Sequence, residues 1–454
     1  IELLQAVGGW KAAHPAPDGD ARQELLLNLA QIPGVYVPAL YEVEYAEDGA
    51  LTAIRPADEA APQCVLKRIL PQLGPAPVKP IVPLMQTVHD RAMVEIQRGC
   101  SRGCRFCQAG MIYRPIRERP VAETLDTIDA IIASTGHSEV SLVSLSSSDH
   151  SGIAEIVQQT MARHAEEGLS VSLPSLRIDS FSVQLAKMIQ STRKTGFTFA
   201  PEAGSQRLRD VINKGVTEED LLRTAQAAFE HGWNHIKLYF MIGLPTETDE
   251  DVAEIARLAQ ELAHLGRQMR GRRIEIAVSV ATFVPKPHTP FQWEPLASHE
   301  DIVRRQRLLR DALRSRTFKL SYSDWEATWL EALFARGDRR LGAAVYRAWQ
   351  LGARFDAWSE CLNMTIWEQS LAELTAELGY DLAAMLHCRR EHTAPLPWSH
   401  IDVGLSPSFL WEEYERALRG GLSPDCRGNC HDCGILHAFA NERATVAANA
   451  WGCP

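Results

Sequence analysis

Between about residues 91 and 290 the sequence alternates strand-like apolar runs with amphipathic, helix-like runs. The predicted strands cover 92–97, 138–145, 169–173, 196–200, 234–242 and 274–284, and the predicted helices cover 120–134, 152–166, 180–190, 217–230 and 248–265. Strands that alternate with helices indicate a parallel sheet, and six such units predict a sheet curved into a partial (β/α)6 barrel. Active sites of barrels lie at the C-terminal ends of the strands, so the residues directly after each strand are the candidate site residues.

Three cysteines follow the first predicted strand. Cys100, Cys104 and Cys107 lie in a glycine-rich loop with the spacing C-x3-C-x2-C, and the aromatic Phe106 precedes the last of them. Thiolates are the ligands of iron–sulfur clusters, and a loop this short can wrap one cluster, leaving one iron of a four-iron cluster free. A zinc knuckle is the alternative, but the second C-x2-C pair or nearby histidine that zinc sites usually have does not occur beside Cys107.

This loop resembles the C-x3-C-x-aromatic-C signature of the radical S-adenosylmethionine (SAM) superfamily. The resemblance implies a 4Fe–4S cluster on Cys100, Cys104 and Cys107, with the amino and carboxylate groups of SAM on the fourth iron. It also implies that one electron cleaves SAM to methionine and a 5′-deoxyadenosyl radical, and that a flavodoxin- or ferredoxin-like protein donates the electron. Backbone around Phe106 is then expected to contact the adenine.

The ends of the second and third strands carry further polar residues. The serine-rich segment 144–151 places Ser146 and Ser148 where the resemblance implies contact with the SAM amino group, although Ser148 or Asp149 can equally cap a helix. After the third strand, Arg177 is positioned to meet a carboxylate or ribose, or alternatively to form a purely structural pair with Asp179.

The later strand ends also resemble known segments. Pro201-Glu202-Ala203-Gly204-Ser205 is similar to a segment of cobalamin-type radical SAM proteins and methylthiotransferases, which implies that Glu202 lies near the polar groups of SAM; the alternative is a surface carboxylate. The turn with Gly243 and Leu244 resembles the adenine-lining turn of the superfamily, and its main role is expected to be structural. The Pro-rich segment 283–293 either lines the substrate site or links the barrel to the next domain.

The end of the chain carries a second group of cysteines. Cys426, Cys430, Cys433 and Cys453 lie within the last 29 residues, and four grouped thiols predict either a zinc site or a second iron–sulfur cluster. His431 and His437 are alternatives to Cys453 as the fourth ligand.

We expect four parts in the chain. Residues 1–90 form a small α+β cap, with a helix from Asp20 and a hairpin that turns at Asp48-Gly49. A Pro-rich connector leads to the barrel at 91–295, which is followed by a helical domain at 296–420 and a Cys-rich metal-binding tail at 421–454. Four tryptophans are expected to anchor the helical domain, namely Trp325, Trp329, Trp349 and Trp358.

Charge and composition limit the partners. The net charge of −10 argues against a general polyanion binder. RNA or a ribosomal protein is still a candidate substrate, because the resemblance includes methylthiotransferases and because arginines cluster at 267–273 and 304–314. No apolar run approaches the ~20 residues of a membrane span. Grouped thiols without an export signal favour the cytoplasm.

Two questions stay open at this point. The chain starts with Ile1, which suggests missing upstream sequence, and the resembling branch generally begins with a cobalamin-binding-like domain. The sequence holds no Asp-x-His-x-x-Gly cobalamin motif, so cobalamin binding is left undecided. The alternative to a radical enzyme is a non-enzymatic, metal-stabilised binding or electron-transfer protein.

Overall fold

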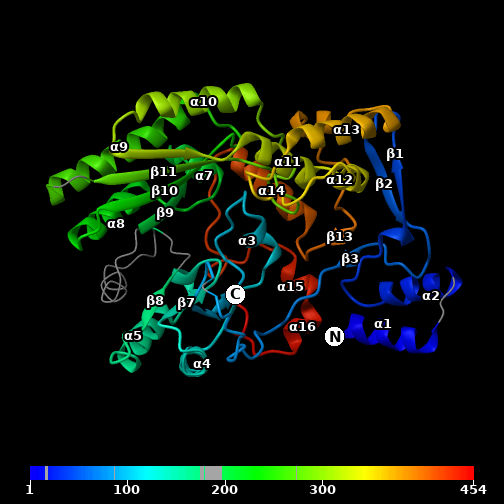
Figure 1. The fold of residues 1–454 in the computed structure, drawn as a ribbon, viewed down its shortest axis with the longest axis horizontal. Helices are drawn as coiled ribbons and strands as arrows, with labels where there is room; N and C mark the ends of the chain where they lie inside the picture. The colour runs from blue at the N-terminus through cyan, green and yellow to red at the C-terminus, as the bar shows by residue number, and fades with distance from the viewer. Residues whose placement is uncertain (16–18, 86, 174–177, 179–196, 272–273, 454) are drawn as a thin grey trace.

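The computed structural model describes residues 1–15, 19–85, 87–173, 178, 197–271 and 274–453. Two parallel sheets form its centre (Figure 1). The first has the order β4 (Ala92–Glu95), β7 (Glu139–Val143) and β8 (Ser170–Ser172), and the second has the order β12 (Phe318–Tyr322), β11 (Glu275–Thr282), β10 (His235–Ile242) and β9 (Phe197–Glu202). All six predicted strands are present, and the α/β fold with parallel sheets is confirmed.

A seventh parallel strand follows the six that were predicted. β12 pairs with β11 from Ile276↔Phe318 to Val280↔Tyr322, and α10 (His299–Ala312) connects the two strands. The sheet therefore continues past residue 295, where the sequence placed the end of the barrel. β12 is short and alternates between half-buried and exposed side chains, so its pattern was hidden within an otherwise helical region.

Amphipathic helices cover the sheets. α4 (Val121–Thr135) and α5 (Ile153–Arg163) pack on the first sheet, and α8 (Glu218–Glu230) and α9 (Asp249–Arg270) pack on the second. The buried residues of α9 recur every three or four positions and meet the fully buried Leu238 and Val278 of the sheet. Thr248 begins α9 with a capping box, in which its side chain and that of Asp251 bind each other's backbone N–H groups.

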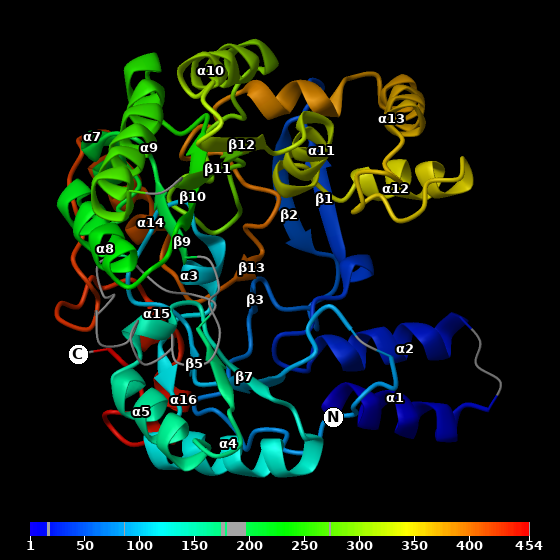
Figure 2. The ribbon, with the colours of Figure 1, turned by 60° about the vertical axis from the view of Figure 1, so that its left-hand side comes forward.

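The N-terminal residues form a separate layer beside the sheets (Figure 2). This layer contains α1 (Glu2–Ala13), α2 (Gly19–Ala30), the short η1 (Pro38–Leu40) and the hairpin of β1 (Tyr41–Tyr45) and β2 (Leu51–Pro56). The predicted hairpin is present in antiparallel register. β3 (Val65–Leu66) pairs in parallel with β13 (Ile401–Asp402), which ties this layer to the C-terminal part of the chain.

A helical segment follows β12. It contains α11 (Trp325–Arg336), α12 (Leu341–Gln350), α13 (Met364–Leu378) and η3 (Leu382–His387). The expectation that Trp349 and Trp358 anchor its core is wrong, because they are 52% and 63% exposed. Trp367 takes that place instead, at 5% exposed, and Trp325 and Trp329 pack at the edge of the same core.

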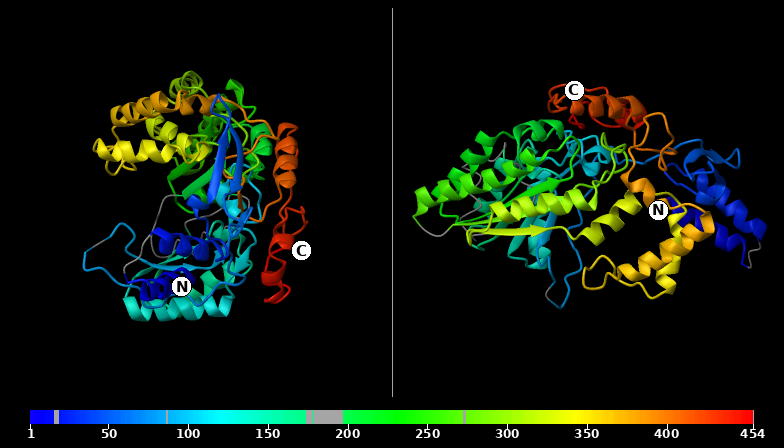
Figure 3. Two further views of the ribbon diagram at one scale, coloured as in Figure 1. Left: turned by 90° about the vertical axis from the view of Figure 1, so that its right-hand side faces the viewer. Right: turned by 90° about the horizontal axis from the view of Figure 1, so that it is seen from above.

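The C-terminal segment runs along one side of the molecule, in orange to red in Figure 3. It contains α14 (Pro407–Leu418), α15 (Ile435–Ala438) and α16 (Ala440–Ala444). Its apolar side chains share one core with the short α7 (Gln206–Val211) and with Met111 of α3 (Gln108–Ile112). The end of the chain therefore packs directly on the region of the first cysteine group.

Candidate iron–sulfur site

The first cysteine group lies on a loop with a tightly fixed backbone. A two-residue ladder of β5 (Gln97–Arg98) and β6 (Arg117–Glu118) closes its base. Gly99 has φ +86°, and a Cβ at this position would lie 2.6 Å from the carbonyl oxygen of Pro115. Only glycine fits this combination of left-handed backbone and close approach.

The last cysteine of the loop begins a helix. The Cys107 N–H donates to the Cys104 carbonyl at 3.0 Å, and the Cys107 Sγ accepts the Gly110 N–H at 3.3 Å as α3 starts. Burial raises the pKa of Cys107, and the neighbouring Cys104 thiol raises it further. A partly buried thiol that accepts a backbone N–H suits a cluster ligand, because such hydrogen bonds stabilise cluster sulfurs. The donor set, three thiols on one short loop, therefore fits a 4Fe–4S cluster by its chemistry.

A buried ion pair anchors the loop to the end of the chain. Arg105 is fully buried, and its Nε donates to Glu413 of α14 at 3.1 Å. Its Nη1 donates to the Val211 carbonyl at 2.9 Å, and its Nη2 donates to the Gly421 carbonyl at 2.7 Å. The guanidinium thus joins three segments that are distant in the sequence.

Asn213 holds the loop from the opposite side. Its Nδ2 lies 3.2 Å from the carbonyl oxygens of both Arg102 and Gly103, and 3.1 Å from that of Ser423, while its Oδ1 accepts the Ser423 N–H at 2.9 Å. Sequence reasoning missed this role, although Asn213 lies in the motif that follows Glu202. Its position just after α7 was the available signal.

The serines after β7 serve the loop through Asp149. Ser146 is 2% exposed and donates to Asp149 at 2.6 Å, and Asp149 pairs with Arg102 of the loop at 2.5 Å. Ser148 is half-buried in the short η2 (Ser147–Asp149). The hydroxyl of Ser146 is therefore engaged within the protein, and the SAM contacts expected of Ser146 and Ser148 stay predictions.

Glu202 lies close to the third cysteine. It has φ +68° at the end of β9 and accepts from Lys214 at 3.1 Å. Both side chains act on the Cys107 thiol, since Lys214 lowers its pKa and Glu202 raises it. Glu202 is therefore a partly buried, paired carboxylate with a left-handed backbone, and the contact with SAM expected of it stays a prediction. Arg177 lies outside the described residues.

The turn after β10 is closed by internal hydrogen bonds. The Gly243 N–H donates to Glu247 at 2.6 Å, and Glu247 pairs with Arg305 at 2.9 Å. Leu244 is 4% exposed within the C-terminal core, and Phe106 is partly buried against the same core. These contacts give the turn a structural role, while adenine contacts by Gly243, Leu244 and Phe106 stay predictions.

The loop after β11 borders a large cavity. His288, Gln292 and Trp293 line a cavity of about 430 Å³ together with Trp398 and other C-terminal residues. The Gln108 side chain donates to the Pro287 carbonyl at 3.1 Å, which connects this loop to α3 and hence to the cysteine loop. Burial lowers the pKa of His288 to about 4. Both roles expected for this loop, the lining of a substrate site and the link to the next domain, stay predictions.

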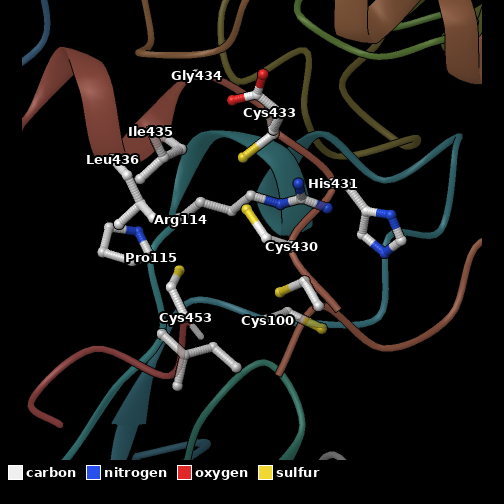
Figure 4. A pocket seen from close by; sticks show the side chains of 13 residues that line it. Cys100, Arg114, Pro115, Cys430, His431, Cys433, Gly434, Ile435, Leu436 and Cys453 are labelled. Atoms are coloured by element: carbon white, nitrogen blue, oxygen red, sulfur yellow. The ribbon is translucent and has the colours of Figure 1, made fainter. Parts of the chain in front are cut away.

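The second cysteine group lines another cavity (Figure 4). Cys426, Cys430, Cys433 and Cys453 surround it, and Cys100 of the first loop lies in its wall. Within the described ranges, no three His, Cys, Asp or Glu side chains are arranged to hold a single metal ion. Burial raises the pKa of Cys426 to about 12 and also raises that of Cys453.

The two histidines proposed as alternative ligands differ in position. His431 lines the cavity, with its Nε2 2.9 Å from the Pro424 carbonyl, whereas His437 lines the larger neighbouring cavity. The arginines that suggested RNA are partly paired with acids, since Arg304 binds Asp249 and Asp301, and Arg305 binds Glu247.

Comparison with known proteins identifies the central domain. Residues 94–259 match the family described as "Radical SAM superfamily". An uncharacterized protein of Methanocaldococcus jannaschii is 33% identical over 251 residues, which are 55% of this chain and 52% of that protein. The ribosomal protein uS12 methylthiotransferase RimO of Desulfotalea psychrophila is 27% identical, over 41% of this chain and 44% of its own length. The chain thus spans about half the length of the curated relatives it matches.

A solved structure is also similar. The cobalamin-dependent S-adenosylmethionine radical enzyme OxsB, with aqua-cobalamin and S-adenosylmethionine bound, aligns over 78% of this chain and 58% of the OxsB chain, at 14% identity and a TM-score of 0.36.

Within the described part of the chain, no helix has the length and apolar character required to cross a membrane.

Proposed function

We propose that this chain, whose residues 94–259 match the radical SAM superfamily, is an enzyme that binds a 4Fe–4S cluster through Cys100, Cys104 and Cys107 and cleaves SAM reductively. The observation that carries the proposal is the cysteine loop after β4, which is held by contacts of Arg105, Asn213 and Arg102. When held by Cys100, Cys104 and Cys107, the cluster would supply the one electron that reductive cleavage of SAM requires.

The protein's own residues position and shield this chemistry. Arg105 and Asn213 fix the loop backbone, and Arg102 adds a pair with Asp149. The C-terminal segment contacts the loop through a hydrogen bond from the Cys426 N–H to the Ser101 carbonyl at 3.1 Å, which supports a shielding role for this segment. Exclusion of water protects a reactive radical from side reactions.

The Glu202–Lys214 pair is our candidate for SAM recognition. It lies beside Cys107, and its carboxylate can accept hydrogen bonds from the ammonium group of SAM while Lys214 balances its charge. Phe106 is half-buried beside this region and offers its backbone to the adenine.

The proposed substrate is an RNA or a ribosomal protein that receives a methyl or sulfur-containing group. Two relatives support this class, the ribosomal protein methylthiotransferase and a threonylcarbamoyladenosine tRNA methylthiotransferase of Treponema pallidum, 28% identical over 39% of this chain. The cavity of about 430 Å³ beside the loop after β11 is the proposed place for the reacting part of the substrate. A flavodoxin- or ferredoxin-like protein of the cytoplasm is the proposed electron donor.

The experiment is anaerobic reconstitution with iron and sulfide, followed by dithionite and SAM, with 5′-deoxyadenosine as the product measured. Cys104→Ala removes one proposed ligand, and Cys361→Ala is the matched control because Cys361 is an exposed free thiol outside both groups. We expect deoxyadenosine from the wild type and from Cys361→Ala, and a loss of at least tenfold in Cys104→Ala. A wild-type protein that holds only zinc and forms no deoxyadenosine would overturn the proposal.

A further inference from the structure

The four C-terminal cysteines come together through three separate docking contacts. The Cys426 N–H donates to the Ser101 carbonyl at 3.1 Å, and the Cys433 carbonyl accepts the Ser406 N–H at 2.9 Å. Cys453 follows Trp451, which is 2% exposed and donates from its Nε1 to the Pro71 carbonyl at 2.8 Å. The cavity that these thiols line is therefore built by tertiary structure, since their spacing in the sequence alone does not create it.

A buried arginine enters the same cavity. Arg114 is 4% exposed, and Figure 4 shows its side chain extending among Cys430, Cys433 and Cys453. Its Nε and Nη1 have no hydrogen-bond partner within the described structure. A buried charged donor without an acceptor is strongly unfavourable. The cavity thus requires a ligand that is anionic and that accepts hydrogen bonds.

The position of Arg114 is itself fixed. It lies two residues after the end of α3, its guanidinium lies 5.4 Å from the centre of the Phe409 ring, and its carbonyl oxygen lies 3.4 Å from Lys67 Nζ. A methyl group at Gly103 would lie 3.4 Å from Arg114 Nη2, so the guanidinium also borders the first cysteine loop. The orientation of Arg114 toward the thiols is therefore set by the fold on several sides.

We propose that Cys426, Cys430, Cys433 and Cys453 bind a second iron–sulfur cluster, and that Arg114 donates hydrogen bonds to its sulfur atoms. Four thiolates on a cluster give a net anion, which matches the unpaired cation. All four thiols line one cavity, and a cluster held by four thiolates would bring bridging sulfide atoms that can accept hydrogen bonds from Arg114.

Arg114 is then a positioning and tuning residue. Hydrogen bonds to cluster sulfurs and nearby positive charge both stabilise the reduced, more negative cluster, so they raise its reduction potential. This role concerns the second cluster alone. It does not depend on SAM cleavage at the first loop.

The test separates the second cluster from the first. In Cys104→Ala/Cys107→Ala the first site loses two ligands while Cys100 still lines the cavity, and we expect about four iron atoms and four sulfides per chain from one remaining cluster. The addition of Cys430→Ala and Cys433→Ala should remove this iron. Zinc in place of iron, or no iron in the first double variant, would overturn the proposal.

The role of Arg114 is measured in the same Cys104→Ala/Cys107→Ala background. Arg114→Met should shift the reduction potential of the remaining cluster to more negative values, and Arg114→Lys should restore part of the shift. If Arg114→Met fails to fold, as judged by circular dichroism, the Lys variant alone still reports the altered hydrogen bonding through its potential. An unchanged potential in the folded variants would refute the role of Arg114. Because no deoxyadenosine assay enters, failure here is distinguishable from failure of the proposed function.

Discussion

Replacement of Arg105 by methionine tests how the C-terminal segment stabilises the cysteine loop. The substitution keeps much of the apolar stem but removes the guanidinium, which donates to Glu413 and to the Val211 and Gly421 carbonyls within the core. Loss of one partner from a buried ion pair costs about 3–5 kcal/mol, because the other charge stays buried without compensation. Glu413 keeps an ion pair with Arg416 at 3.3 Å and a hydrogen bond from Ser423 at 2.6 Å, so we expect the lower end, about 3 kcal/mol.

The assay is urea unfolding followed by circular dichroism and tryptophan fluorescence, together with the iron content after reconstitution. Arg55→Met is the matched control, because Arg55 forms an exposed pair with Glu44 and such pairs contribute only about 0–1 kcal/mol. The Arg105 variant should unfold at a clearly lower urea concentration and retain less iron than the wild type. Equal midpoints for the two variants would refute the reasoning.

Three further substitutions probe the loop, the cavity and the helix caps. Gly99→Ala should lower the free energy of unfolding by about 1–3 kcal/mol and reduce iron binding. Gly136→Ala is the control, because Gly136 also has a positive φ but no atom lies near the new Cβ, and it should cost only about 1 kcal/mol in urea unfolding. His288 has a pKa of about 4 in the folded protein against 6.5 in the unfolded chain, so between pH 4 and 6.5 the unfolded chain binds more protons. The free energy of unfolding should therefore fall by up to about 3 kcal/mol as the pH falls from 6.5 to 4. His288→Asn should flatten this part of the pH profile, and an unchanged profile would contradict the assignment. Thr248→Ala should cost about 1 kcal/mol through loss of the capping box of α9, which the same unfolding curves measure.

Local pattern was enough to predict much of the fold. The six strands and the cysteine loop were predictable because alternation, helical periodicity and cysteine spacing are properties of short stretches. β12 escaped because five alternating residues between two helices carry little pattern. Trp349 and Trp358 were misplaced because a large apolar side chain does not by itself indicate which face of the segment is buried.

The contacts that complete the candidate site could not be predicted in this way. Ser101 and Asp425, which hydrogen-bond at 2.8 Å, are 324 residues apart in the sequence. Arg114 and Asn213 are ordinary polar residues in the sequence, and their roles arise only when the C-terminal segment folds back over the loop. Even the grouping of the tail cysteines with Cys100 around one cavity is a tertiary property.

The most direct test of the central claim is electron paramagnetic resonance of the reduced loop cluster with and without SAM. The variant Cys430→Ala/Cys433→Ala simplifies the spectrum, because it removes two thiols of the second cavity and leaves Cys100, Cys104 and Cys107 in place. A cluster held by three thiolates has one iron free for SAM, so addition of SAM should change the g values of the signal. A signal that SAM leaves unchanged, in a variant with its full complement of loop-cluster iron, would contradict the assignment of this loop as the site of SAM cleavage.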